Sequence, residues 1–171
     1  MRLPAFLLAG LATLAATAVT AAVPAPKVKA ASFEQLAKPL PLPYDEGADA
    51  KAVVAKAKAK AKASGKLLLI DLGGNWCLDC RILAGTVELP DLKPFVEKHY
   101  VEAVVDVGRF DKNLDIPAHY GFTKRLAGVP AVLIVDPKTD KLINAGDTTA
   151  LSDARSMNPQ GLADYLAKWA R

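Results

Sequence analysis

The middle of the chain alternates short apolar runs with turn residues, a pattern typical of a protein built from strands and helices. Residues 66–72 are mostly apolar and predict a buried central strand, and Gly73 and Gly74 follow as a turn. A helix is predicted to begin at Cys77, because apolar positions continue after it along one face of a helix. These positions are Ile82, Leu83 and Val87.

Strands and helices continue to alternate toward the C-terminus. The predicted elements are a short helix over 91–100, strands over 101–107, 131–135 and 141–145, and a turn over 136–140. A final helix is predicted with Asn158 as its N-cap and Pro159 at its first position. Its apolar side chains recur at spacings of three and four: Leu162, Tyr165, Leu166 and Trp169. This order of elements predicts an α/β fold.

A further helix is predicted before the first strand. Residues 48–63 alternate Ala and Lys, which favour helix over strand, and Ser64 and Gly65 provide a stop. The expected buried side consists of Val53, Val54, Ala57 and Ala61. The lysines fall all around such a helix, which favours a solvated surface with packed side-chain stems over a dedicated contact site for anions.

The first 22 residues have the composition of a signal peptide. Arg2 precedes an Ala/Leu-rich stretch, and the small residues at 20–22 suit signal-peptidase cleavage. We therefore expect export, to the periplasm if the source is a Gram-negative bacterium. An uncleaved membrane anchor is the alternative, because no charge occurs between Arg2 and Lys27 and that span could cross a bilayer.

The rest of the chain divides into a proline-rich segment and one globular domain. Residues 23–44 contain five prolines, which favour extended backbone and predict a tether or an arm laid along the domain surface. Residues 45–171 are expected to form the domain, since 171 residues with 51% hydrophobic content suit one compact unit. A net charge of +4 without an arginine cluster gives no indication of a nucleic-acid partner, and we expect a monomer.

The only two cysteines of the chain lie together in Trp76-Cys77-Leu78-Asp79-Cys80. No other sulfur remains for a disulfide framework, so the two cysteines are expected to react with each other and with a partner. His99 and His119 are isolated in the sequence and are expected at the surface. Together these residues do not make a four-ligand zinc pattern, and no metal site is predicted.

At this point the chain resembles the thioredoxin superfamily. Asp71 lies six residues before Cys77, as the acid of thioredoxins does, and Gly85 falls where a proline commonly kinks the helix of that family. Tyr120-Gly121 and then Gly128-Val129-Pro130 resemble the loop that presents the family's cis-proline. The resemblance covers roughly residues 45–171 and implies a mixed β-sheet flanked by helices, with the predicted N-terminal helix as an addition.

Two features depart from the thioredoxin pattern. Residues 108–127 are longer than the matching loop, and Glu102 lies about where thioredoxin keeps a buried lysine near its acid. The long loop and the Ala/Lys helix are candidate specificity surfaces.

The resemblance and the chemistry of cysteine together assign roles to the site residues. Cys77 at a helix N-terminus would be the nucleophile, because the helix dipole stabilises its thiolate, and Cys80 would resolve the mixed disulfide. Asp71 would relay a proton to or from Cys80; the alternative is a strand-end carboxylate that caps nearby amides.

The substrate-binding positions are expected to flank the two cysteines. Trp76 would shape the contact with partners. A cis Pro130 would leave the backbone of Val129 free to pair with an extended partner segment.

The two residues between the cysteines, Leu78 and Asp79, are expected to tune the redox couple. A carboxylate at Asp79 opposes the Cys77 thiolate by less than about 3 kcal/mol at an effective dielectric near 20. Solvent exposure and the neighbouring Arg81 are expected to reduce this effect further. The expectation is a reducing couple, in which Asp79→Asn lowers the pKa of Cys77 and raises the reduction potential.

The sequence therefore predicts a thiol-disulfide oxidoreductase that acts on protein thiols and disulfides as a reductant, with no cofactor beyond the Cys77–Cys80 disulfide. No flavin or nicotinamide motif is present, so electrons would come from a partner, such as a membrane-embedded thiol donor. The alternative is a Cu(I)-binding module or metal chaperone that uses the same two thiolates. Against it, Met157 would be the only methionine left after removal of the signal peptide.

Overall fold

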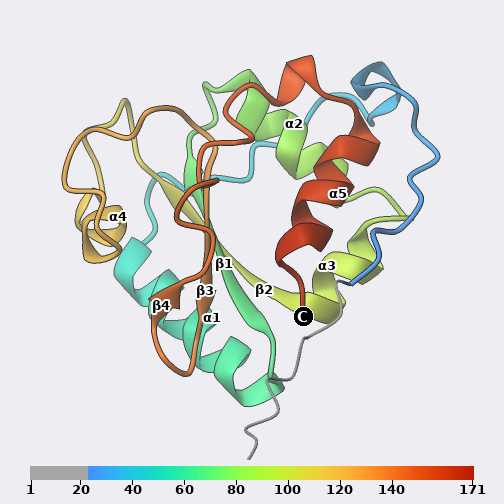
Figure 1. Ribbon diagram of the computed structural model, residues 1–171. Coiled ribbons are helices and arrows are strands. Elements are labelled where there is room, and N and C mark those ends of the chain that lie inside the picture. Colours follow the sequence, from blue (N-terminus) through green and yellow to red (C-terminus); the bar gives the residue numbers. More distant parts are fainter. Residues whose placement is uncertain (1–22) are drawn as a thin grey trace, which may run out of the picture.

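The computed structural model describes residues 23–171, and its centre is a four-stranded β-sheet (Figure 1). The strands are β1 (Leu67–Gly73), β2 (Tyr100–Asp106), β3 (Ala131–Asp136) and β4 (Lys141–Leu142). Their order in the sheet is β2-β1-β3-β4, with β1 parallel to β2 and the other pairs antiparallel. The α/β fold with a mixed sheet is thus confirmed.

Helices cover both faces of the sheet (Figure 1). They are α1 (Ala50–Ser64), α2 (Leu78–Val87), α3 (Lys93–His99), α4 (Asp115–His119) and α5 (Pro159–Trp169), with 3-10 turns η1 (Phe33–Gln35) and η2 (Ala154–Ser156). Every residue of β1 is buried, because its alternate side chains meet helices on opposite faces. Leu68 and Ile70 pack on the α1 side, whereas Leu67 and Leu69 pack on the side of α2 and α5.

Local sequence explains where the two longest helices begin and end. The Asp49 carboxylate accepts a hydrogen bond from the Ala52 amide at the start of α1, and Gly65, with φ of 69°, closes the helix in the left-handed conformation. The Asn158 side chain accepts from the Gly161 amide at the start of α5. Val53 and Val54 of α1 are partly buried against the sheet, and Ala57 and Ala61 are buried, which is the side predicted from the sequence.

The predicted strand over 141–145 is wrong in its length, since β4 contains only Lys141 and Leu142. Beyond them the Ile143 amide still donates to the Ile134 carbonyl at 2.8 Å, and the Asn144 side chain then replaces backbone pairing. The Asn144 amide accepts from the backbone N–H of Ile134 and donates to the carbonyl of Val132, each at 2.8 Å. Asn144 is fully buried, so these bonds give its side-chain amide the hydrogen-bond partners that a buried polar group requires.

The surface position predicted for His99 is also wrong. The residue is buried, its ring stacks on Phe95 with 4.6 Å between centroids, and its Nδ1 lies 3.1 Å from the carbonyl oxygen of Arg171. His119 is exposed as predicted and contacts Asp140. The long loop over 108–127 contains the short helix α4, which ends at His119.

The proline-rich segment is an arm that packs on the domain rather than a tether. Leu36 and Leu40 are buried in the cluster formed with α2 and α5. The Gln160 side chain of α5 holds the start of the arm by accepting from the Val28 amide and donating to the Pro26 carbonyl. A Cβ on Gly85 would lie 3.3 Å from the Leu40 side chain, so the glycine lets the arm lie close to α2.

The predicted signal peptide, residues 1–22, lies outside the described residues. Within residues 23–171, no helix has the length and apolar character needed to cross a membrane.

Candidate redox site

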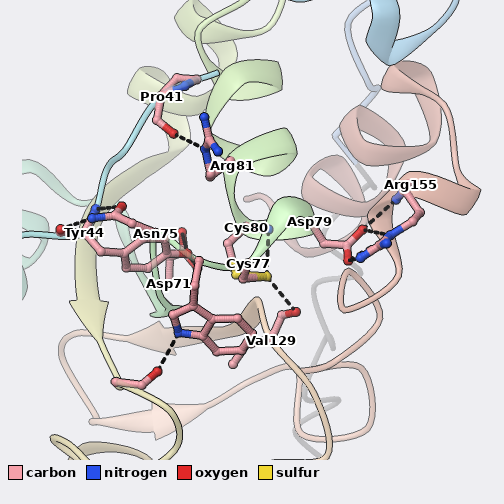
Figure 2. Close-up of a disulfide and its surroundings, with 12 residues drawn as sticks. Pro41, Tyr44, Asp71, Asn75, Cys77, Asp79, Cys80, Arg81, Val129 and Arg155 are labelled. Carbon is pink, nitrogen blue, oxygen red and sulfur yellow. Dashed lines mark hydrogen bonds and ion pairs between the residues drawn. A yellow bond between two sulfur atoms is a disulfide. The ribbon is translucent and has the colours of Figure 1, made fainter. Parts of the chain in front are cut away.

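Cys77 and Cys80 form a disulfide at the start of α2 (Figure 2). Cys77 is the N-cap of the helix, and its sulfur accepts a hydrogen bond from the Cys80 amide at 3.1 Å. Cys80 lies in the first turn and is fully buried, whereas Cys77 keeps 5% of its surface exposed. A partner can therefore reach the sulfur of Cys77 first, and the N–H groups at the helix N-terminus favour a thiolate there.

The loop before β3 faces the disulfide. The Val129–Pro130 peptide bond is cis, and the carbonyl oxygen of Val129 points at Cys77 with 3.4 Å between oxygen and sulfur (Figure 2). Val129 and Pro130 thus lie against the less buried of the two cysteines, as the sequence analysis expected of a partner-binding position.

Asp71 lies on β1, buried beneath the start of α2. Burial raises the pKa of the Asp71 carboxyl to about 7, the hydrogen bond from Tyr44 lowers it, and the negative charge of Glu102 raises it. Asp71 therefore exchanges its proton near neutral pH, as a general acid or base requires.

Tyr44 is the functional residue that the sequence analysis missed. Its hydroxyl donates to Oδ1 and Oδ2 of Asp71, at 2.9 Å to each, and burial beside that carboxylate strongly raises the pKa of Tyr44. Gly73 has no side chain to separate Tyr44 from Cys80. A Cβ there would lie 2.7 Å from both the Cys80 sulfur and the Tyr44 ring carbon that bears the hydroxyl. The phenol hydroxyl thus lies close to both Asp71 and Cys80.

Asn75 fixes Tyr44 in this position. Its side-chain oxygen accepts from the Tyr44 amide at 3.1 Å, and its side-chain nitrogen donates to the Tyr44 carbonyl at 2.8 Å (Figure 2). The turn after β1 therefore binds the end of the arm through two hydrogen bonds between Asn75 and Tyr44.

The expected surroundings of Asp79 are wrong. Its side chain is buried, not exposed, and its partner is Arg155 of η2, not Arg81 (Figure 2). Arg155 donates its backbone amide at 2.9 Å and its Nε at 3.1 Å to Oδ1, and its Nη2 to Oδ2. Burial alone would raise the pKa of Asp79, but the bonds from Arg155 outweigh it and hold that pKa below the usual value.

Arg81 instead turns toward the arm. It donates to the carbonyl oxygens of Leu40 at 2.9 Å and Pro41 at 3.1 Å. Residues two apart on a helix do not share a face, which explains why Asp79 and Arg81 have different partners.

Trp76 and Leu78 are exposed on either side of Cys77, with 42% and 45% of their surface open. The Trp76 indole donates to the Gly108 carbonyl at 2.7 Å, which ties the residue before Cys77 to the long loop. Both are apolar groups that a protein partner could cover.

A hollow of about 280 Å³ reaches Asp71 from the other side of α2. Asp71 and Glu102 both line it, together with Leu83, Val87 and Glu88. Glu102 thus adds a like charge near the acid, which accounts for the upward contribution to the pKa of Asp71 at the position where the sequence departs from thioredoxin. Within residues 23–171, no group of three or more His, Cys, Asp or Glu side chains is placed to hold a metal ion.

The comparisons with known proteins agree with this geometry. A family described as thioredoxin-like matches residues 49–137. The solved structure of a disulphide isomerase from Xylella fastidiosa Temecula1 is 39% identical, with a TM-score of 0.69 over 75% of this chain and 97% of that chain.

Two further solved structures are more distant. A DsbH oxidoreductase is 18% identical, with a TM-score of 0.39 over 72% of this chain and 93% of that chain. A Pseudomonas aeruginosa protein of unknown function is 20% identical, with a TM-score of 0.37 over 71% and 85%. None of the curated proteins compared with the chain matches it.

Proposed function

Because the chain belongs to the thioredoxin-like family and is a protein-disulfide oxidoreductase, we propose that it reduces disulfides in exported proteins. The observation that carries this proposal is the Cys77–Cys80 pair at the N-terminus of α2, with the Val129 carbonyl 3.4 Å from the Cys77 sulfur. A nucleophilic sulfur and a surface for an extended partner segment lie side by side.

The exchange takes two steps. The Cys77 thiolate attacks one sulfur of a substrate disulfide, forming a mixed disulfide and releasing the other substrate sulfur as a thiolate. The Cys80 thiolate then attacks the Cys77 sulfur, which forms the Cys77–Cys80 disulfide and releases the second substrate thiolate. Two electrons pass from the protein to the substrate, and the released thiolates take up two protons at neutral pH.

Asp71 and Tyr44 serve the second step. Cys80 must lose its proton before it can attack, and Cys80 is fully buried away from water. Asp71, with its pKa raised to about 7 chiefly by burial, accepts this proton with the Tyr44 hydroxyl beside it. The hollow shared with Glu102 gives the proton a path to solvent.

The Asp79–Arg155 pair supports the reducing direction. A free cation near the Cys77 thiolate would stabilise the reduced form and make the disulfide more oxidising. Asp79 instead engages Arg155 through four hydrogen bonds and neutralises its charge. The Cys77 thiolate therefore receives no stabilisation from a free Arg155 cation, which keeps the Cys77–Cys80 disulfide less oxidising.

A reductant must be reduced again after each cycle. We propose that a membrane-embedded thiol donor supplies the electrons, that residues 1–22 direct export, and that the protein works as a monomer. Arg2, the uncharged Ala/Leu-rich stretch that follows it and the small residues at 20–22 support export.

Trapping tests the exchange, and redox equilibration tests its direction. In the full-length chain, Cys80→Ser should accumulate a mixed disulfide with a protein substrate, whereas Cys77→Ser should form none. The reduction potential of the native pair should lie near that of reducing thioredoxins, at about −270 mV. A value near the strong oxidants, at about −120 mV, would contradict the reducing direction. Failure of Cys80→Ser to form a mixed disulfide would contradict the exchange itself.

A further inference from the structure

Two arginines and two aromatic rings form a contiguous group next to the redox disulfide, called the stack below, in which the planes of the two rings are tilted by 58°. The Arg109 guanidinium lies 4.5 Å from the centroid of the Trp76 ring, and the Arg125 guanidinium lies 4.3 Å from that of Phe110. The two rings are 6.1 Å apart between centroids. Because Trp76 immediately precedes Cys77, the stack borders the nucleophilic cysteine.

The loop holds this stack in a defined position. The amides of Phe110 and Asp111 donate to the Val107 carbonyl at 2.9 and 3.1 Å, and Asp111 accepts from the Arg109 amide at 2.8 Å. The indole of Trp76 is fixed by its bond to the Gly108 carbonyl. Both arginine side chains therefore lie on aromatic rings that these hydrogen bonds hold in place.

The charges of the stack are unpaired within residues 23–171, whereas neighbouring charges are paired. Lys112 forms an ion pair with Asp106, and Lys51 pairs with Asp115. Among the described residues, no carboxylate oxygen lies within 4 Å of the side-chain nitrogens of Arg109, Lys124 or Arg125.

Lys124 and Arg125 also line a hollow of about 370 Å³ formed with Phe122, Thr148 and Thr149. The long loop thus presents fixed cations both beside Trp76 and along this hollow.

We infer that this stack docks an acidic segment of the substrate protein, adjacent to the disulfide that Cys77 attacks. A ring covers one face of each guanidinium and leaves the N–H groups at its edge free, and these match a carboxylate in planar, bidentate geometry. Two such groups recognise two carboxylates along an extended segment. The inference rests on the proposed function and adds the substrate class.

The test uses three short peptides that each contain one intramolecular disulfide flanked by two Asp, two Asn or two Lys residues. The measured quantity is the second-order rate constant with which each peptide oxidises the reduced full-length protein. The Asp peptide should react about tenfold faster than the Asn peptide, and the Lys peptide should be slowest. About 0.5 M NaCl should reduce these differences.

Matched variants separate the stack from the overall charge. The double variant Arg109→Gln/Arg125→Gln should bring the three rate constants within about twofold of one another. The control Lys62→Gln/Lys138→Gln makes the same charge change at the end of α1 and in the turn after β3, and should keep the preference for Asp.

Equal native rates for the three peptides would overturn the docking inference and leave the proposed function standing. A preference for Asp that the control variant abolishes to the same extent would also overturn it, in favour of net charge. Absence of reaction with all three peptides would count against the proposed function instead.

Discussion

The Tyr44 hydroxyl donates to both carboxylate oxygens of Asp71, at 2.9 Å to each. Tyr44 belongs to the arm that precedes the domain, whereas Asp71 lies on the central strand β1. The proton affinity of the buried acid therefore depends on a residue outside the segment that contains the cysteines. A hydrogen bond from a neutral donor favours the charged carboxylate, so Tyr44 opposes the upward effect of burial.

Removal of this bond should raise the pKa of Asp71. In Tyr44→Phe, we expect the pH midpoint of the exchange rate to move upward from about 7 by about one unit. Rate measurements across the pH range check this. Tyr100→Phe is the matched control, because its buried hydroxyl donates to the Leu166 carbonyl at 2.6 Å, away from the cysteines. An unchanged or lower midpoint in Tyr44→Phe would contradict the assignment.

Asp71 should also make stability depend on pH. Its pKa is about 7 in the folded protein and 3.8 as the ordinary value, so the folded state binds the proton more tightly. The resulting stabilisation is present below pH 3.8 and is lost as the pH rises through about 7. Asp71→Asn stays neutral, so it should match the native protein near pH 4 and exceed it by up to about 4 kcal/mol near pH 8.

Urea unfolding at several pH values measures this difference. Glu34→Gln, at an exposed carboxylate of the arm, provides the control. Its difference from the native protein should stay flat with pH, and a flat difference for Asp71→Asn would refute the raised pKa.

The charges of Asp79 and Arg155 should have opposite and nearly equal effects on the reduction potential of the Cys77–Cys80 couple. Asp79→Asn removes a carboxylate two residues from Cys77 and takes away the partner that neutralises Arg155, so it should raise the reduction potential by about 10–30 mV. Arg155→Met leaves a carboxylate without its partner and should lower the potential. The double variant should return close to the native potential, because both charges are gone.

Equilibration with glutathione for all four proteins measures the coupling. A double variant that keeps the full shift of either single variant would contradict the balanced effects of the pair.

Gly85 should be intolerant of larger side chains because of the arm. At a solvent-exposed helix position, Gly→Leu stabilises by about 1 kcal/mol through helix propensity. Here the Cβ alone would come within 3.3 Å of Leu40 and 3.4 Å of Leu36, so Gly85→Leu should instead destabilise by about 1–3 kcal/mol. Gly146→Leu, in a turn where nothing lies within 4 Å of a Cβ, controls for the added side chain without a steric clash. Denaturant unfolding gives the comparison, and a stabilised Gly85→Leu would show that the arm does not press on α2.

Local sequence pattern was sufficient to predict β1 and the helices α1 and α5. The apolar run before Gly73, the helix stop at Gly65 and the cap at Asn158 each depend on neighbours in the sequence. The length of β4 and the burial of His99 did not follow from local pattern. The Asn144 side chain bonds across the turn to Ile134, ten residues earlier, and Arg171 contacts His99 over a separation of 72 residues.

The partners of the site residues could not be predicted for the same reason. Arg155 lies 76 residues after Asp79, and Tyr44 lies 27 residues before Asp71. Proximity in sequence suggested Arg81 for Asp79, but the turn of the helix directs Arg81 to the arm. A proline-rich composition predicted extended backbone without indicating that a tyrosine at its end reaches the buried acid.

The attachment of the arm to α5 has a consequence for the order in which the molecule can assemble. Val28 bonds to Gln160, a separation of 132 residues, and the arm reaches the redox site only after crossing α2. During synthesis, the two cysteines and their helix emerge well before α5 exists. Contacts this distant in sequence form late. Both thiols are therefore present in the growing chain while the arm still lacks Gln160, the residue to which it binds.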